Sequence, residues 1–367
     1  MITVADIIAE MESFASLRLA ADWDNVGLLI GRRERLVERI MTCLTITPTT
    51  AAEAIARQVS VIVTHHPVLF RPTKRLTSDQ PEGRMLVDLI RADIAVYSPH
   101  TAFDNCPGGI NDHLAELIGL SDVKPLRHHT GGPRQLKLVA FVPESDLSRV
   151  SDAVFAEGAG VIGQYNQCSF RVAGTGTFYG SDASNPTIGQ KGRREEVSEW
   201  RVEYVCPEAK LSSVLAALRR AHSYETPAFD VYPLAPLPGP GEGRVGRLSA
   251  TTTLGNLAGQ LRDRLRCGPV GIVGDPDRAV CSVALACGAA GEYIADAARV
   301  GADVFLTGEA RFHECLDAQA RGIGLLLPGH HATERPGVEM LAQRLAVRFP
   351  GVQAWAGECE ADPISYI

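Results

Sequence analysis

The feature that most constrains the fold of this chain is an alternation of apolar, β-rich runs with helix-like stretches, found near both ends of the sequence. Near the start, such runs alternate with helical patterns at 40–46, 51–58, 59–64, 83–91 and 94–98. Near the end, they do so at 280–286, 292–300, 304–307, 312–320 and 323–327. This alternation is typical of parallel α/β layers. We therefore expect an α/β protein with a three-layer core and a mostly parallel sheet built from both chain ends.

Two segments rich in proline and glycine, 125–133 and 236–243, interrupt the alternation and resemble linkers. The stretch 135–234 between them is close to the β-α-β-β-α-β order of ferredoxin-like modules, with one extra strand. The sequence thus predicts that 1–128 and 244–367 are the two halves of the α/β core. It also predicts that 135–234 is an inserted ferredoxin-like α+β domain.

Composition excludes several classes of protein. With 45% hydrophobic and 22% charged residues the chain is globular, and no apolar run reaches the roughly 18 to 20 residues of a membrane helix. Acidic residues interrupt the first helical stretch, so we expect no export signal, no membrane partner and a cytoplasmic protein. A net charge of -7 makes nucleic acid an unlikely partner. The nine cysteines form no Cys-x-x-Cys pair, which argues against disulfides and thiolate zinc.

One apparent cofactor-binding motif lies in the wrong structural context. Gly158-Ala-Gly160-Val-Ile-Gly163 matches the dinucleotide pattern, but it follows a helical stretch, whereas the phosphate-binding version follows a strand and opens a helix. We therefore expect turn glycines there and no organic cofactor.

Polar side chains follow three of the predicted strands. The buried run 61–64 leads into His65 and His66, at the carboxyl edge where open α/β sheets place ligands. Neighbouring side chains on a strand face opposite ways, so the two imidazoles can share a site only where the strand ends. A hydrogen-bonded structural pair is the open alternative.

The next strand is followed by His100 and Asp104, of which Asp104 is the candidate ligand and His100 the supporting or structural residue. A turn or cap aspartate is the alternative for Asp104. After the third strand, Thr333 as N-cap with Pro336 in the first turn predicts a helix that starts near Glu334 and leaves His330 in the preceding loop. A loop histidine and a helix-start glutamate without a ligand are the alternative there.

Together, His65, His66, Asp104, His330 and Glu334 suit Zn, Fe, Mn, Co or Ni and suit Ca or Mg poorly. Two divalent transition-metal ions per subunit would bring four positive charges against two carboxylates. The excess favours water or an anionic small-molecule substrate such as a phosphate, as in two-metal hydrolysis.

At these residues the chain resembles the GTP cyclohydrolase I type 2 homolog family, the Nif-three-like dinuclear-metal proteins. The matching segments are Trp23-Asp24-Asn25-Val26-Gly27-Leu28, Thr64-His65-His66-Pro67, His100-Thr101-Ala102-Phe103-Asp104, Asp303-Val304-Phe305-Leu306-Thr307-Gly308-Glu309 and Gly329-His330-His331-Ala332-Thr333-Glu334. The resemblance implies that the five residues named above are the metal ligands, with Glu334 bridging. It also implies that the insert is a trimerising PII-like or CutA-like domain, and that the chain forms a homohexamer of two trimers.

Three functions are compatible with these features. The first is a metal-dependent hydrolase, of cyclohydrolase or phosphoesterase type, acting on a nucleotide or a phosphorylated small molecule; GTP as substrate is implied by the resemblance alone. The second is a non-catalytic, metal-holding scaffold or regulator shaped as a ring. The third, binding of single-stranded nucleic acid or a protein inside the ring, is weakened by the acidic charge balance.

Overall fold

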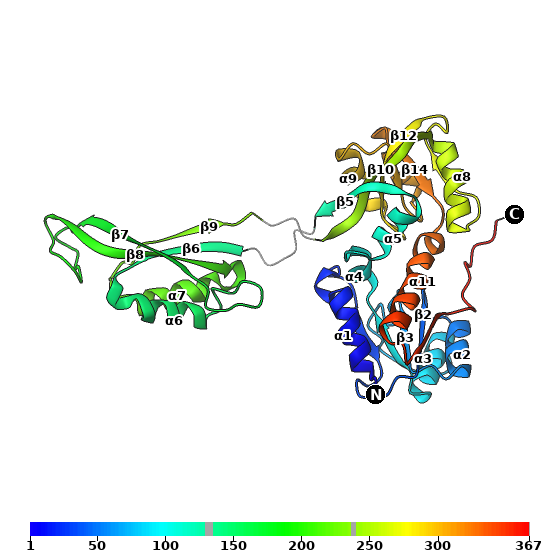
Figure 1. Ribbon diagram of the computed structural model, residues 1–367, viewed down its shortest axis with the longest axis horizontal. Coiled ribbons are helices and arrows are strands. Elements are labelled where there is room, and N and C mark those ends of the chain that lie inside the picture. Colours follow the sequence, from blue (N-terminus) through cyan, green and yellow to red (C-terminus); the bar gives the residue numbers. More distant parts are fainter. Residues whose placement is uncertain (129–134, 236–239, 367) are drawn as a thin grey trace. The chain divides into compact units, whose positions relative to one another are not determined.

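The computed structural model describes residues 1–128, 135–235 and 240–366, and the chain divides into two compact units (Figure 1). Residues 1–129 and 240–367 form the first, called the core unit below, and residues 130–239 form the inserted unit. All nine cysteines are free thiols. Among the described residues, no helix is both long and apolar enough to cross a membrane.

The first sheet of the core unit has five strands in the order β1-β4-β3-β2-β15. The strands are β1 (Gly27–Ile30), β2 (Arg39–Cys43), β3 (Val61–Thr64), β4 (Ala95–Ser98) and β15 (Gln353–Ala356). All neighbours run parallel except β1, which lies antiparallel to β4. The helices near it are α1 (Val4–Phe14), the 3-10 helix η1 (Leu17–Leu19), α2 (Pro48–Ala56) and α3 (Pro81–Arg91).

Alternate residues of β3 face two different apolar clusters. Val61 and Val63 pack in a cluster with residues of α1, whereas Ile62 packs in one with residues of α2 and α3. Every residue of β3 and β4 is buried, as expected for parallel strands that are covered on both faces. The α/β class and the strands predicted near the start are therefore confirmed.

The core unit contains a second sheet, of six strands in the order β11-β14-β13-β12-β10-β5, instead of the single sheet that we expected. Its strands are β5 (Leu120–His128), β10 (Gly241–Thr253), β11 (Gly271–Val273), β12 (Ala279–Leu285), β13 (Val304–Leu306) and β14 (Gly324–Leu327). Only β12, β13 and β14 run parallel to one another. Helices α8 (Leu254–Leu265), α9 (Ile294–Arg299) and α10 (Phe312–Ala320) and the 3-10 helix η4 (Gly291–Tyr293) accompany it.

The strands that leave and re-enter the core unit explain why this sheet is not mostly parallel. β5 runs out toward the insert and β10 runs back, so the two pair antiparallel, with Arg244 opposite Pro125 and Gly241 opposite His128. The predicted linkers 125–133 and 236–243 were therefore too long, because 125–128 and 241–243 are strand. Residues 129–133 and 236–239 of those linkers lie outside the described residues.

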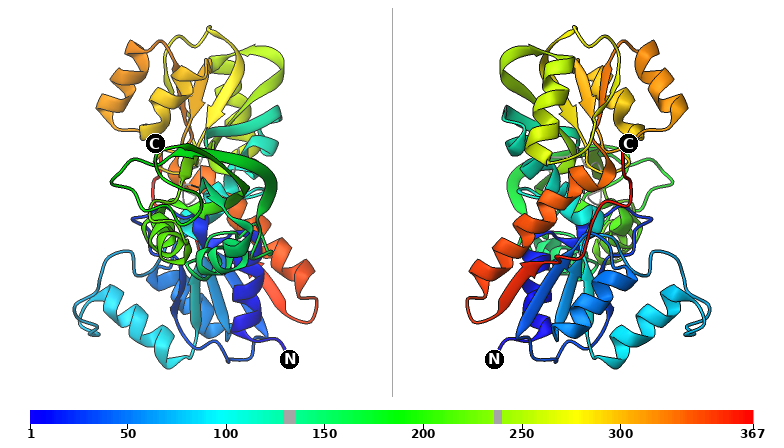
Figure 2. Two further views of the ribbon diagram at one scale, coloured as in Figure 1. Left: turned by 90° about the vertical axis from the view of Figure 1, so that its left-hand side faces the viewer. Right: turned by 90° about the vertical axis from the view of Figure 1, so that its right-hand side faces the viewer.

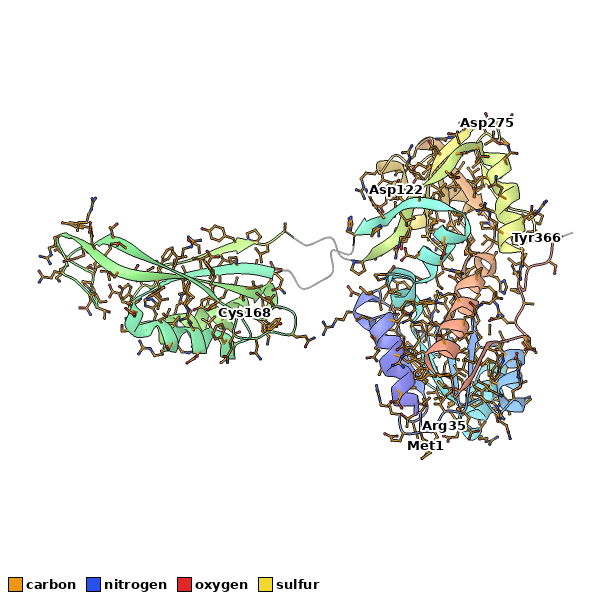
Figure 3. The ribbon with its side chains drawn as sticks, viewed as in Figure 1. Met1, Arg35, Asp122, Cys168, Asp275 and Tyr366 are labelled. Carbon is orange, nitrogen blue, oxygen red and sulfur yellow. The ribbon has the colours of Figure 1, made fainter. Side chains whose placement is uncertain are left out.

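The two sheets share a hydrophobic core that α11 (His330–Arg348) helps to close. This helix packs against β2 and β15 of the first sheet and against α8 and α5 (Ile110–Leu117), and both views of Figure 2 show it along the core unit. Met1 and Arg35 mark the end of the core unit with the first sheet, and Asp122 and Asp275 the end with the second (Figure 3). Residues between the sheets are therefore held from both sides.

The inserted unit has an antiparallel sheet of four strands in the order β7-β8-β6-β9. Along the chain its elements are β6 (Gln135–Val142), η2 (Glu144–Asp146), α6 (Leu147–Ala156), β7 (Phe170–Tyr179), β8 (Arg194–Pro207), η3 (Glu208–Lys210), α7 (Leu211–Ala221) and β9 (Phe229–Pro233). The extra strand that we expected is not among the described residues, because β8 is one continuous strand of 14 residues. The hydrophobic core of the inserted unit contains the buried residues Leu138, Val150, Val202, Val214 and Leu218.

Candidate metal centre

The structure brings the five predicted residues together between the two sheets. His65 and His66 directly follow β3 of the first sheet, and Asp104 lies on the short helix α4 (His100–Asn105) that follows β4. His330 and Glu334 lie on α11, which follows β14 of the second sheet. Asp104 thus follows β4 as predicted, within a helix and not in the turn that was the alternative.

Glu334 lies at the centre of the cluster. Its Oε2 is 3.1 Å from the Nε2 atoms of both His66 and His330, and its Oε1 is 3.7 Å from Nε2 of His65. The same His65 nitrogen is 3.6 Å from Oδ1 of Asp104. The Nε2 atoms of His66 and His330 are 3.4 Å apart. One carboxylate therefore faces three imidazoles, an arrangement that can share its two oxygens between neighbouring cations.

The predicted start of the last helix was wrong by one turn. α11 begins at His330, after Gly329 at φ 108°, and Pro336 lies inside it. Thr333 does not act as N-cap, because its hydroxyl donates to the carbonyl of His330 at 2.9 Å and accepts from Gly288 N at 3.0 Å. His330 and Glu334 are consequently one helical turn apart and lie on one face of the helix.

A glycine in the loop that follows β12 of the second sheet allows the carboxylate of Glu334 to lie where it does. A Cβ on Gly288 would overlap Oε1 of Glu334 and lie 3.3 Å from Nε2 of His330, and the residue has φ +65°. The Thr307 hydroxyl donates to the carbonyl of Gly288 at 3.0 Å and accepts from Ala290 N at 3.1 Å. The backbone at Gly288 is therefore held tightly against the cluster, where only glycine fits.

Two of the imidazoles are oriented by partners that sequence reasoning missed. Nδ1 of His66 is 2.7 Å from the hydroxyl of Thr45, and Nδ1 of His330 is 2.9 Å from Oε1 of Glu309. Each contact leaves Nε2 of its ring facing Glu334. Partners of this kind fix the orientation of metal-binding histidines. Glu309 ends a segment that carries the family resemblance, whereas no signal in the sequence marks Thr45.

His65 gives the sharpest test of whether the cluster fits a metal ion. The residue is only 2% exposed, and neither of its ring nitrogens has a hydrogen-bond partner among the described residues. A buried imidazole without partners is costly, so such groups call for an explanation. A cation bound between His65 and the two carboxylates would satisfy Nε2, and the mixed nitrogen and oxygen donors suit a transition metal.

His100 belongs to the cluster, although we had expected a supporting role for it. Within the part of the chain that the structure describes, two groups have ligand atoms close enough to share an ion: His65, His66 and His100, and His66, His330 and Glu334. The backbone of His100 has φ 31°, a strained value for a non-glycine residue, and its Nδ1 is 2.8 Å from Oδ1 of Asp24. Strain of this kind is often found at functional sites.

The electrostatics of the cluster follow from its burial. Burial alone would raise the pKa of Glu334, but the imidazoles, His65 foremost, hold this pKa well below its usual value. Glu334 in turn raises the pKa of His330 to about 9. Burial raises the pKa of Asp104 and lowers that of His66. A negative carboxylate is thus kept among groups that must lose protons when a metal ion binds.

The fold and these side chains define an α/β protein with a buried histidine and carboxylate cluster that can hold metal ions. A sequence model of the Duf34/NIF3 (NGG1p interacting factor 3) family matches residues 2–363. The "GTP cyclohydrolase 1 type 2 homolog" of Bacillus subtilis is 36% identical over 365 residues, 98% of each chain. That of Mycobacterium tuberculosis is 35% identical over 352 residues, 95% of this chain and 92% of the relative. The chain belongs to the Duf34/NIF3 family.

Solved structures agree with this membership. A Bacillus cereus protein related to NIF3 is 34% identical, with a TM-score of 0.68 over 100% of this chain and 99% of that one. A Staphylococcus aureus protein is 25% identical, with a TM-score of 0.79 and the same coverage. The predicted resemblance is therefore confirmed over nearly the whole chain.

Proposed function

We propose that this chain is a dinuclear-metal protein that acts as a metal-dependent hydrolase on a nucleotide or a phosphorylated small molecule. The observation that carries the proposal is the buried imidazole of His65, which lies beside Asp104 and Glu334 and has no hydrogen-bond partner in the part of the chain that the structure describes. A cyclohydrolase or phosphoesterase reaction would suit such a centre. The name of the Bacillus subtilis relative, GTP cyclohydrolase 1 type 2 homolog, points to the former.

The proposed ligands are His65, His66, Asp104, His330 and Glu334, with Glu334 bridging, and His100 is added to them from its place in the cluster. Two divalent ions of Zn, Fe, Mn, Co or Ni would supply Lewis acidity toward water and substrate oxygens. Thr45 and Glu309 would keep two of the imidazoles in place. The two carboxylates leave the loaded centre with excess positive charge, which favours an anionic substrate.

The exposure of the ligands indicates the side from which a substrate approaches. The side chains of His66 and His330 are 26% and 34% exposed, whereas that of Glu334 is 5% exposed. Solvent therefore reaches the centre past the two outer imidazoles, while the bridging carboxylate stays dry. An anion that enters on this side meets the outer histidines first.

The test compares the metal content and turnover of the wild type with those of Glu334→Gln. We expect two ions per chain in the wild type, with loss of ions and of turnover on a panel of nucleotides and phosphoesters in Glu334→Gln. Glu339→Gln is the matched control, because Glu339 lies on the same helix with a side chain that is 50% exposed. Turnover that survives Glu334→Gln contradicts the proposal. Bound metal without turnover of any substrate would favour the scaffold function.

We also propose the assembly and location that the resemblance implies. The inserted unit would be a ferredoxin-like, PII-like or CutA-like module that builds trimers, with boundaries 1–128, 135–234 and 244–367, a three-layer core and a homohexamer of two trimers. Exposed apolar side chains on β7, Phe170 and Val172 among them, support a contact surface there. Free cysteines suit the cytoplasm. Analytical ultracentrifugation should give a mass of six chains, and a monomer would contradict this assembly.

A further inference from the structure

Two exposed aromatic side chains lie beside the metal centre. Trp23 is 64% exposed and Phe70 is 49% exposed, and their ring centroids are 5.9 Å apart in an edge-to-face arrangement. The ring of His100 lies 6.1 Å from Trp23 and 6.3 Å from Phe70. The ring centroid of His65, one of the candidate ligands, lies 5.1 Å from that of His100. Trp23 and Phe70, called the aromatic pair below, therefore border the candidate ligands.

The backbone around the aromatic pair is held in place by polar contacts. The side-chain amide of Asn25 donates to the carbonyl of Leu69 at 2.6 Å and so ties together the two segments that carry the pair. The carboxylate of Asp24 accepts from the backbone N–H and the hydroxyl of Thr101 and lies 2.8 Å from Nδ1 of His100. The segment with Trp23 is thus anchored to the helical turn that presents His100. A subsite built in advance loses little entropy on binding.

The chemistry around the pair indicates what covers it. A contiguous exposed apolar patch rimmed by polar residues marks a binding site more often than a single exposed apolar side chain does. Two rings at 70° to each other can offer one face for stacking and one edge for contact with a planar ring. The neighbouring metal centre, once loaded, carries the excess positive charge that favours an anion. A ligand with both a planar ring and a negative charge therefore matches the pair and the centre together.

We propose that the aromatic pair is the subsite for the nucleobase of a small nucleotide whose phosphate binds at the metal centre. This inference rests on the proposed function and narrows its substrate class from phosphorylated molecules in general to those that carry a heteroaromatic base. Stacking on aromatic side chains tolerates any base, so the subsite selects base-bearing ligands over sugar phosphates and does not choose among bases.

The experiment measures binding of guanosine 5′-monophosphate and ribose 5-phosphate to the full-length, metal-loaded protein by calorimetry. We expect the wild type to bind the nucleotide about tenfold more tightly or better, which is the range that stacking of one base supplies. Trp23→Ala should lose that preference, and Trp23→Phe should keep most of it. Tyr165→Ala, which removes a ring that is 76% exposed in the inserted unit, is the control and should keep the full preference.

The outcomes separate this inference from the proposed function. Equal affinity of the wild type for the two ligands, or an equal loss for both in Trp23→Ala, overturns the nucleobase subsite even if metal-dependent phosphate binding persists. A short oligothymidylate that binds more tightly than the mononucleotide overturns it as well, in favour of single-stranded nucleic acid. Absence of bound metal overturns the proposed function, whereas a preference for the nucleotide that survives treatment with EDTA still supports the subsite.

Discussion

Two buried polar clusters of the core unit differ in how completely they satisfy their own atoms. Arg244 of β10 donates to both carboxylate oxygens of Asp112 and to the carbonyls of Gly241, Gly243 and Cys106. His65, equally buried, has no hydrogen-bond partner for either ring nitrogen among the residues that the structure describes. A cluster that only stabilises a fold closes its hydrogen bonds, whereas one built for a ligand leaves an atom open. This difference separates the cluster around Arg244 from the metal centre.

Removal of the metal should have the largest effect. It should act only on the cluster around His65, which is called the open cluster below because the ring nitrogens of His65 have no hydrogen-bond partner among the described residues. Treatment with EDTA should lower the free energy of unfolding of the wild type by about 3 to 4 kcal/mol, the gain expected for a ligand at 100 to 1,000 times its dissociation constant. Urea denaturation with and without EDTA measures it. Glu334→Gln should show no such difference, since it would hold no ions. An unchanged midpoint for stripped wild type would mean that the cluster around His65 is not completed by metal.

The next effect concerns the cluster around Arg244 and Asp112, which is called the closed cluster below. Arg244→Met leaves Asp112 without its main counter-charge and removes one hydrogen-bond donor from each of three carbonyls, so the free energy of unfolding should fall by about 3 kcal/mol. The folded variant should still hold its metal ions and respond to EDTA. Arg262→Met is the control, because its ion pair with Asp263 is exposed, and its urea midpoint should not change. Loss of metal from folded Arg244→Met would remove the distinction between the two clusters.

The sequence predicted which residues meet better than it predicted where they meet. Carboxyl ends of parallel strands share an edge, and this rule correctly drew attention to His65, His66 and Asp104. His330 and Glu334, however, follow a strand of a different sheet. Apolar runs in a sequence show that strands exist but not which sheet each one joins. The antiparallel pairing of β5 with β10 in the second sheet, for example, joins residues that are more than a hundred positions apart in the sequence, such as His128 and Gly241.

Predictions from local sequence patterns were least accurate where a side chain bonds to residues that are distant in the sequence. Thr333 and Pro336 resemble the start of a helix, but the hydroxyl of Thr333 is engaged by the backbone of Gly288, and the helix begins one turn earlier. The position of His100 could not be predicted for a similar reason, because its partner Asp24 lies far from it in the sequence. Rules for helix caps include only neighbours along the chain, and these two residues are governed by tertiary contacts.

A smaller effect is expected from the substitution of two glycines, each of which has a positive φ. Gly288→Ala places a Cβ against Glu334, so metal affinity should fall by at least about tenfold, with a loss of about 1 kcal/mol in stability from backbone strain. Gly301→Ala, at φ +75° with open space around it, should cost a similar stability and leave metal affinity unchanged. Titration of stripped protein with metal measures the affinities. Equal metal affinity of the two variants would show that the close approach of Gly288 is not needed.

The smallest effect is a pH dependence in a third polar cluster, which is closed like that of Arg244. Burial alone would raise the pKa of Glu53, but the backbone N–H groups of Cys359 and Glu358 hold this pKa below its usual 4.5. Because the folded pKa is the lower one, the stabilisation is complete above pH 4.5 and is lost as the pH falls through the folded value. The urea midpoint of the metal-free wild type should therefore fall more steeply in acid than the urea midpoint of metal-free Glu53→Gln.

The metal centre should respond to acid in a different range, because His330, whose pKa is raised to about 9, takes up a proton well above the pKa of Glu53. On acidification, metal ions should consequently leave before the contribution of Glu53 is lost. Measuring bound metal and the urea midpoint along one pH series tests this order. Coincident loss of both would mean that the open and closed clusters unfold as one unit, whereas release of metal from a still folded chain would show that the open cluster depends on its ligand and the closed one does not.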